Sequence, residues 1–430
     1  MVVRVLRDDA FAAAALDAEL ERNIQLDARD RALATELAYG TLRVLRWLTR
    51  RLDRHASRGI GSVDVQVRAQ LLVGAYQVLV LTRVPAFAAV DEAVSAVKAL
   101  RGPRVAGFAN AVLRKIAAEP KPGPQEVARA ALEAVDPELA RAIVRSIGED
   151  GALALFAQGG GEAPPLGLRV ADPAARDAWI ARLREGRPDA SIEPGRVSPL
   201  AILVRGAGRL SDLPGWAEGA WTSQEEGSQV VALALGARAG ETVLDACAGR
   251  GNKTGLLARA VGAAGAVDAA DLHPAKLERL ASELARLGVA PRATFAVDWA
   301  AGAGGVTDLY DRVLVDAPCS GTGTLRRRPE LLLRRTASDL PALAELQQKI
   351  LARAAGRVRP GGRLVYAVCS VLREEAEDVV AQAGAAGLTP APFDAAIASR
   401  VAADGASSFR LLPHEHGTDG YFVASFVKNA

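Results

Sequence analysis

Short apolar runs alternate with amphipathic segments from Trp221 to the end of the chain. An uninterrupted apolar run is typical of a strand buried on both faces, and its alternation with helical spacing indicates parallel strands joined by helices. We expect strands at 242–244, 266–270, 294–297, 312–315, 363–367 and 421–426. The pattern predicts an α/β domain with a mostly parallel, doubly wound sheet over residues 221–430.

Helical spacing predominates in residues 1–125. In the stretch 29–54, one face is apolar and consists of Leu33, Leu37, Leu42, Leu45, Leu48 and Leu52. Further helices are expected at 65–81, 90–100 and 108–118, separated by Pro85, Gly102 and Pro103. No convincing strand pattern precedes Pro120, so residues 1–125 are predicted to form an all-helical domain.

The residues between these two regions begin with EPKPGP (119–124), whose prolines and glycine indicate a linker or a tight connection. Beyond it we expect helices at 137–147 and 173–183 and strands at 166–170 and 201–204. Residues 126–220 are therefore predicted to form a small α+β domain that links the other two.

The composition is that of a globular protein, with 50% apolar and 24% charged residues. No apolar run approaches the roughly 18 residues of a membrane span, and the N-terminus lacks the features of a signal peptide. We expect a cytoplasmic monomer without a membrane partner. The three cysteines, at 247, 319 and 369, form no CxxC pair, which argues against a disulfide framework or a cysteine zinc site. No metal is expected.

The net charge of +3 is too small to establish a nucleic-acid partner, but arginines are clustered locally. The polar face of the stretch 29–54 carries Arg43, Arg46, Arg50, Arg51 and Arg54. This face is either the solvated surface of an ordinary helix or a surface that contacts phosphates. The helical domain also contains no cysteine.

The strand at 312–315 ends abruptly at Asp316, Pro318 and Cys319, ahead of a loop rich in glycine, serine and threonine. Ligands of open α/β sheets bind beyond the carboxyl ends of the strands, so these side chains are candidates for chemistry. The alternative is a buried, inert cysteine. Three arginines follow at 326–328, and a basic, wet environment is expected to favour the thiolate.

A second stretch, RLVYAVCSVLREE (363–375), repeats the arrangement. The strand at 363–367 is followed by Cys369 and Ser370. Two thiols at strand ends of one sheet are hard to explain as packing. The residues alone leave the roles of the two thiols open.

The first strand of the sheet runs into VLDACAGRGNKT (243–254), where Gly249 and Gly251 allow the backbone to approach a ligand. The alternative is an ordinary tight turn between strand and helix. Asp271 ends the next strand, at the place of an acid that binds ribose hydroxyls, and Asp298 ends the third, within reach of an adenine. The loop fits neither GxGxxG nor GxxxxGK[ST], so an adenosyl ligand without a phosphate chain, S-adenosylmethionine, suits it better.

At this point the residues match a known family. Residues 222–430 resemble the RNA cytosine-C5 methyltransferases, and the whole chain resembles their Fmu/Sun (RsmB) branch, which acts on small-subunit ribosomal RNA and has an N-terminal NusB-like domain. The matching segments are DAPCSGTG (316–323), YAVCSVLREE (366–375), LPHEHGTDGYF (412–422), TSQEEGSQ (222–229) and GFANAVLRKI (107–116). The resemblance implies a Rossmann-like methyltransferase domain at 221–430, a NusB-like RNA-binding domain at 1–125, and RNA as the partner.

The resemblance also implies roles for individual residues. Cys369 would attack C6 of cytosine, Cys319 would assist release of the product, Asp316 would hold the base through its N3 and amino edge, and Lys253 would lie near the reacting base. The residues implied to surround S-adenosylmethionine are Cys247, Ala248, Gly249, Arg250, Gly251, Asn252, Lys253, Asp271, Asp298 and Asp316. Pro318-Cys319, by contrast, resembles the Pro-Cys nucleophile of the DNA cytosine methyltransferases, which would make Cys319 the nucleophile.

The chain departs from the family in the cofactor loop. The family commonly has a sequence close to APGGKT, whereas AGRGNKT here places Arg250 at the family's proline and Asn252 at a glycine. The resulting prediction is an S-adenosylmethionine-dependent RNA cytosine-C5 methyltransferase acting on small-subunit ribosomal RNA. The alternatives are a transfer RNA methyltransferase with the same chemistry, and a non-catalytic RNA-binding or assembly factor whose altered loop no longer holds cofactor.

Overall fold

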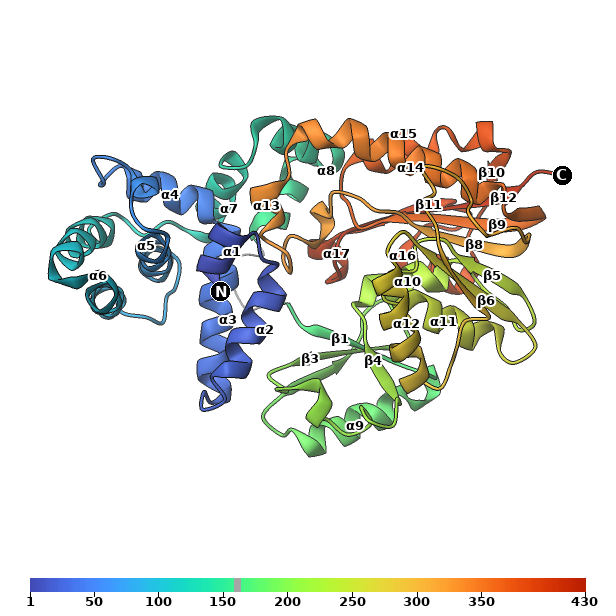
Figure 1. Ribbon diagram of the computed structural model, residues 1–430, viewed down its shortest axis with the longest axis horizontal. Coiled ribbons are helices and arrows are strands. Elements are labelled where there is room, and N and C mark those ends of the chain that lie inside the picture. Colours follow the sequence, from blue (N-terminus) through green and yellow to red (C-terminus); the bar gives the residue numbers. More distant parts are fainter. Residues whose placement is uncertain (158–163) are drawn as a thin grey trace. The chain divides into compact units, whose positions relative to one another are not determined.

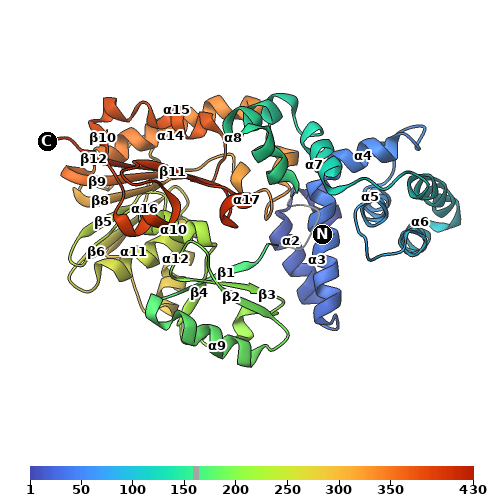
Figure 2. The same ribbon diagram turned by 180° about the vertical axis from the view of Figure 1, so that it is seen from behind.

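The computed structural model describes residues 1–157 and 164–430, and the chain forms two compact units (Figure 1; Figure 2). The helical unit comprises Met1–Pro164 and Thr324–Ala337, and the sheet unit comprises Pro165–Gly323 and Ser338–Ala430. The unit boundary thus differs from the boundaries expected at 125 and 220. Where the structure describes the chain, no helix is both long and apolar enough to cross a membrane.

The helical unit contains no strand within its described residues, which confirms the all-helical prediction. Its helices are α1 (Val2–Asp8), α2 (Ala12–Arg22), α3 (Ala28–Arg43), α4 (Leu45–Asp53), α5 (Val65–Leu79), α6 (Ala86–Ala117), α7 (Pro124–Glu133) and α8 (Pro137–Ala157). The helices expected on either side of Gly102 and Pro103 are the two arms of α6, which bends where Gly102 adopts a φ of 80°.

The arginine face of α3 and α4 is only partly available to a ligand. Arg43 is buried, with 7% of its surface exposed, and Arg51 forms an ion pair with Glu119 at 2.7 Å. Arg50 and Arg54 are exposed. Arg43 and Arg51 therefore stabilise the fold of the helical unit and do not belong to the expected phosphate-contacting face.

The helical unit also contains Thr324–Ala337, a segment that follows the Cys319 loop in sequence and appears in orange beside the blue and green helices of Figure 1. It includes α13 (Leu331–Arg334). The buried guanidinium of Arg43 donates a hydrogen bond to the carbonyl oxygen of Arg326 at 2.7 Å. This bond joins α3 to a segment that is continuous with a predicted site loop.

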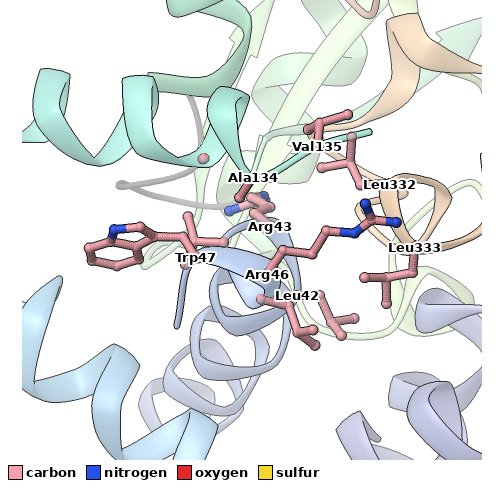
Figure 3. A pocket seen from close by; sticks show the side chains of 11 residues that line it. Leu42, Arg43, Arg46, Trp47, Ala134, Val135, Leu332 and Leu333 are labelled. Carbon is pink, nitrogen blue, oxygen red and sulfur yellow. The ribbon is translucent and has the colours of Figure 1, made fainter. Parts of the chain in front are cut away.

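Apolar side chains of α13 also attach the segment 324–337 to the helices of this unit. Leu332 and Leu333 line a small pocket in the helical unit (Figure 3). The other lining residues come from the junction of α3 with α4 and from the end of α7: Leu42, Arg43, Val44, Leu45, Arg46, Trp47, Ala131, Ala134 and Val135. The N-terminal helices thus contact a segment that follows the Cys319 loop in sequence, which the prediction of a separate RNA-binding domain did not include.

The sheet unit begins with a small antiparallel sheet of order β2-β3-β1-β4. Its elements are β1 (Leu166–Val170), α9 (Arg176–Gly186), β2 (Ser191–Pro194), β3 (Ala201–Arg205) and β4 (Trp221–Ser223). The strands predicted at 166–170 and 201–204 are confirmed. The boundary expected at 220 divides one sheet, because β4 pairs with β1.

A second sheet has the order β10-β12-β9-β8-β5-β6-β7, and β11 pairs with β12. Its strands are β5 (Thr242–Asp245), β6 (Ala266–Asp271), β7 (Ala293–Ala296), β8 (Tyr310–Asp316), β9 (Val358–Val368), β10 (Leu388–Pro390), β11 (Ser408–Leu411) and β12 (Tyr421–Lys428). The pairs among β5 to β9 are parallel, and those of β12 are antiparallel. The doubly wound α/β prediction is confirmed, although β10 and β11 were not predicted.

Alternate residues of β8 pack on opposite faces of this sheet. Val313 and Val315 join the apolar cluster that includes residues of α14 (Leu340–Ala355). Leu314 joins a cluster that includes residues of α10 (Glu226–Ala234) and α11 (Asn252–Val261). Burial on both faces explains the uninterrupted apolar run and fixes the strand ends that carry the site.

Candidate active site

The two candidate thiols lie together at one edge of the sheet. Cys319 follows β8 and Cys369 follows β9, and these parallel strands pair in a register that places Asp316 opposite Ala367. The loops therefore leave the same sheet edge. Their Sγ atoms are 3.4 Å apart, in hydrogen-bond contact, and both cysteines are partly buried and free.

A buried carboxylate joins the two thiol loops. Glu375, six residues after Cys369, has no exposed surface. Its Oε1 accepts hydrogen bonds from the Ser320 backbone N–H at 2.8 Å and from Gln347 Nε2 at 3.0 Å, and its Oε2 accepts from Ser320 Oγ at 2.5 Å. A fully bonded buried carboxylate holds both loops in one arrangement.

The C-terminal GTDGYF segment packs against the Cys319 loop. The Gly323 N–H donates to the carbonyl oxygen of Cys369 at 3.1 Å, and the Gly420 N–H donates to that of Gly323 at 2.8 Å. A Cβ atom on Gly323 would lie 2.1 Å from the carbonyl oxygen of Gly420, so only glycine fits. Three segments distant in sequence thus converge at the thiols.

Lys253 and Asp316 form an ion pair beside the thiols, with Nζ and Oδ2 2.5 Å apart. Burial lowers the pKa of the Lys253 ammonium, but the charge of Asp316 and the hydrogen bond to it outweigh this effect, so the pKa is raised. Lys253 therefore stays protonated at neutral pH.

The surroundings of Cys319 do not favour its thiolate. The hydrogen bond with Cys369, burial, and the charge of Glu375 raise the pKa of Cys319 well above its ordinary value. The arginines at 326–328 lie in the segment that belongs to the helical unit, and Arg326 is buried. The expectation that the surroundings favour the Cys319 thiolate was wrong, and Cys319 remains a thiol at neutral pH.

The predicted cofactor loop connects β5 to α11 and meets the end of β6. Gly249 donates its N–H to Asp271 Oδ2 at 3.0 Å, while Oδ1 of Asp271 accepts from the His273 N–H at 2.9 Å. Gly251 has a φ of 87°, and a Cβ atom there would lie 2.6 Å from Leu280 Cγ. The loop therefore requires glycine at 251, and Asp271 stands at its predicted place.

Comparison with known proteins identifies the family. Residues 232–427 match the family described as 16S rRNA methyltransferase RsmB/F, and residues 1–118 match the NusB family. Ribosomal RNA small subunit methyltransferase B of Pseudomonas putida is 35% identical over 444 residues, which cover 99% of this chain and 96% of that protein. The chain belongs to the RsmB family.

Two further comparisons agree. Ribosomal RNA small subunit methyltransferase B of Salmonella newport is 32% identical over 409 residues, covering 93% of this chain and 91% of that protein. The crystal structure of PH0851 has the same fold, with a TM-score of 0.79 at 24% identity over 95% of this chain and 93% of that chain. The predicted family, the methyltransferase fold and the S-adenosylmethionine cofactor of this RsmB-family chain are confirmed.

The charges around the loop fit this cofactor. Burial and then the charges of Asp245, Asp316 and Asp271 raise the pKa of the Cys247 thiol, which places three carboxylates near one loop. One of them, Asp245, keeps a buried Oδ1 without a hydrogen-bond partner in the described structure. Carboxylates gathered at this loop suit the positive sulfonium and ammonium groups of S-adenosylmethionine.

Not every predicted residue lies in this cluster. Asp298 is exposed, and its Oδ1 accepts from the Ala300 N–H at 2.8 Å. In the part of the chain that the structure describes, no hydrogen bond or ion pair joins Asp298 to the cofactor loop. The side chain of Arg250 is also exposed, while that of Asn252 is partly buried.

Sequence reasoning missed three contributors to the site. It assigned no role to Glu375, although this residue lies in a segment that matches the family. It also missed the hydrogen bond that buried Thr254 donates to Asp245 Oδ2 at 2.7 Å. It also overlooked Arg169, a buried charged residue in the strand predicted at 166–170. A charge inside an apolar run is the signal that could have singled out Arg169.

Proposed function

We propose that the protein methylates C5 of a cytosine in small-subunit ribosomal RNA, through a temporary covalent bond between Cys369 and C6 of the base. The observation that carries the proposal is the 3.4 Å contact between the Sγ atoms of Cys319 and Cys369, beside the ion pair of Lys253 with Asp316. Thiol, acid and cation are the groups that activation of a cytosine requires.

The chemistry explains this requirement, because C5 of cytosine is a poor nucleophile. When the Cys369 thiolate adds to C6, the C5=C6 electron pair becomes available at C5, and charge that develops toward N3 is stabilised by a proton or a hydrogen bond there. Asp316 accepts from the amino edge of the base, and the protonated Lys253 bonded to it is a source for the proton at N3. S-adenosylmethionine supplies the methyl group as an electrophile.

Release of the product reverses the first step. Water takes the proton from C5, the electrons of the C5–H bond restore C5=C6, and the C6–S bond breaks to return the Cys369 thiolate. Cys319 assists this departure: it carries a proton at neutral pH and lies in hydrogen-bond contact with Cys369 Sγ. A proton donor next to the leaving sulfur makes the C6–S bond easier to break.

Ribosomal RNA is favoured as the substrate by two findings. The curated relatives are named for the small ribosomal subunit, and residues 1–118 match the NusB family. The target base must leave its stack to reach the thiols, which costs least in a single-stranded or looped region of RNA.

Bisulfite sequencing tests the proposal. Small-subunit ribosomal RNA and transfer RNA from a deletion strain are treated with the purified protein and S-adenosylmethionine, then sequenced. We expect one cytosine of the ribosomal RNA to become resistant to conversion. Resistance that appears only in transfer RNA would show that transfer RNA, and not ribosomal RNA, is the substrate. If the protein is instead a non-catalytic RNA-binding factor, no cytosine becomes resistant in either RNA, and calorimetry shows no binding of S-adenosylmethionine.

A further inference from the structure

A buried arginine of the small sheet bonds directly to the cofactor loop. Arg169 lies in β1, with 3% of its surface exposed. Its Nη1 donates to the carbonyl oxygen of Asn252 at 2.6 Å and to Gln224 Oε1 at 2.9 Å. Asn252 is the first residue of α11 and the neighbour of Lys253, so the bond reaches the backbone that carries the site cation.

The burial of Arg169 is costly, which makes a role in packing alone a poor explanation. Burial and then the charge of Arg259 lower its pKa to about 10, although Glu283 acts in the opposite direction. Within the described residues, no carboxylate forms an ion pair with it. A buried cation without a paired anion is costly unless hydrogen bonds compensate for its lost hydration, and both of these bonds of Arg169 go to neutral oxygens.

The contacts of Arg169 confine the first turn of α11. A Cβ atom on Gly255 would lie 3.3 Å from Arg169 Nη2, so the guanidinium lies against the helix as well as bonding to its first carbonyl. Two residues of this turn matter for the site: Lys253 pairs with Asp316, and Thr254 donates to Asp245. Movement of the turn would displace both.

We propose that Arg169 is a positioning residue, through which the small sheet fixes the cofactor loop and the Lys253 ammonium. The small sheet is then part of the cofactor site and not only a linker between domains. The inference rests on the cofactor loop, and on the proposed function only for the role of Lys253. Cofactor binding needs no RNA, so a failure of the inference can be told apart from a failure of the cytosine-C5 proposal.

The test compares two arginines that each bond to a carbonyl oxygen of the sheet unit. Arg184 of α9 donates to the Ile192 carbonyl oxygen at 2.9 Å from Nε and 2.6 Å from Nη2, away from the cofactor loop. Arg169→Met, Arg169→Lys and the control Arg184→Met are prepared in the full chain. Calorimetry then gives the Kd for S-adenosylmethionine, and thermal unfolding gives the stability of each variant.

We expect Arg169→Met to weaken cofactor binding at least tenfold, Arg169→Lys to restore part of the affinity through one remaining donor, and Arg184→Met to bind as the unaltered protein does. In turnover assays, Arg169→Met should raise the KM for S-adenosylmethionine more than the KM for RNA. Unchanged affinity in Arg169→Met, or an equal loss in Arg184→Met, would overturn the inference.

If Arg169→Met does not fold, Gln224→Leu replaces it. This change removes one acceptor of Arg169 and leaves the bond to Asn252. The expected loss is then about threefold in affinity for S-adenosylmethionine, with the KM for RNA unchanged. Affinity equal to that of the unaltered protein in both Gln224→Leu and Arg169→Lys would likewise overturn the inference.

Discussion

The Cys319 loop and the Cys369 loop look alike in sequence and differ in their surroundings. Each follows a buried parallel strand, and each places a serine after its cysteine. The Cys319 loop, however, receives Glu375 from the other loop, and its thiol pKa is raised by the bond to Cys369, by burial and by that carboxylate. Two similar strand ends thus acquire different surroundings from the groups that arrive across the sheet edge.

The largest effect is expected from Cys369→Ala. If Cys369 forms the bond to C6, its loss prevents every later step, and turnover should fall by about ten-thousand-fold or more. Covalent trapping on RNA that contains 5-fluorocytosine should also disappear. Denaturing gels of the protein with this RNA and S-adenosylmethionine show the adduct directly. An adduct that persists in Cys369→Ala would reassign the nucleophile to Cys319.

Cys319→Ala should have the opposite effect on the covalent protein–RNA species. The variant keeps the nucleophile, so it should attack and methylate, but it lacks the proton donor beside the leaving sulfur. We expect a covalent protein–RNA species to accumulate even on ordinary cytosine. Cys319→Ala that turns over normally, or that forms no adduct on any RNA, contradicts the assigned role.

A smaller effect is expected from Glu375→Gln, which keeps the size of the side chain that joins the loops. The amide cannot accept from every donor that the buried carboxylate satisfies, so the free energy of unfolding should fall by about 2–3 kcal/mol. The pKa of Cys319 should fall as well, because the negative charge of Glu375 is one cause of its increase.

Denaturant unfolding and the absorbance of the thiolate across pH measure these two effects. The matched control is Glu345→Gln on α14, whose exposed carboxylate pairs with Lys349 at 2.6 Å and should change neither quantity measurably. An unaltered pKa of Cys319 in Glu375→Gln would show that the bond to Cys369 and burial alone hold the proton.

The sequence predicts the parts of the fold that depend on local pattern. The strands β5 and β8 contain the short apolar runs 243–244 and 313–315, and the bend of α6 follows from Gly102 and Pro103. The strands that were missed are short, and two of them, β2 and β10, end in proline, so their periodicity is too brief to recognise. The sequence likewise indicates Cys319, Cys369 and Asp316 as candidates, because each lies at the end of a predicted strand.

The remaining features depend on contacts between distant segments. Nothing in REE (373–375) distinguishes Glu375 from Glu374, because only the folded sheet buries the former against Ser320. The placement of Leu332 and Leu333 among the N-terminal helices is equally invisible to periodicity. The predicted preference of Cys319 for the thiolate was wrong for the same reason: the hydrogen bond with Cys369 and the charge of Glu375, both from the other loop, raise the pKa of the Cys319 thiol.

The smallest effect is expected from changing the cofactor loop to the family's usual sequence, with Arg250→Pro and Asn252→Gly together. The Arg250 side chain is exposed, and Arg169 bonds to the carbonyl oxygen of residue 252, which glycine also provides. We therefore expect the affinity for S-adenosylmethionine, measured by calorimetry, to stay within about threefold or to increase. Both thiol loops should be unaffected, so trapping on 5-fluorocytosine RNA serves as the control. A loss of tenfold or more, about 1.4 kcal/mol, would show that Arg250 and Asn252 contact the cofactor through their side chains.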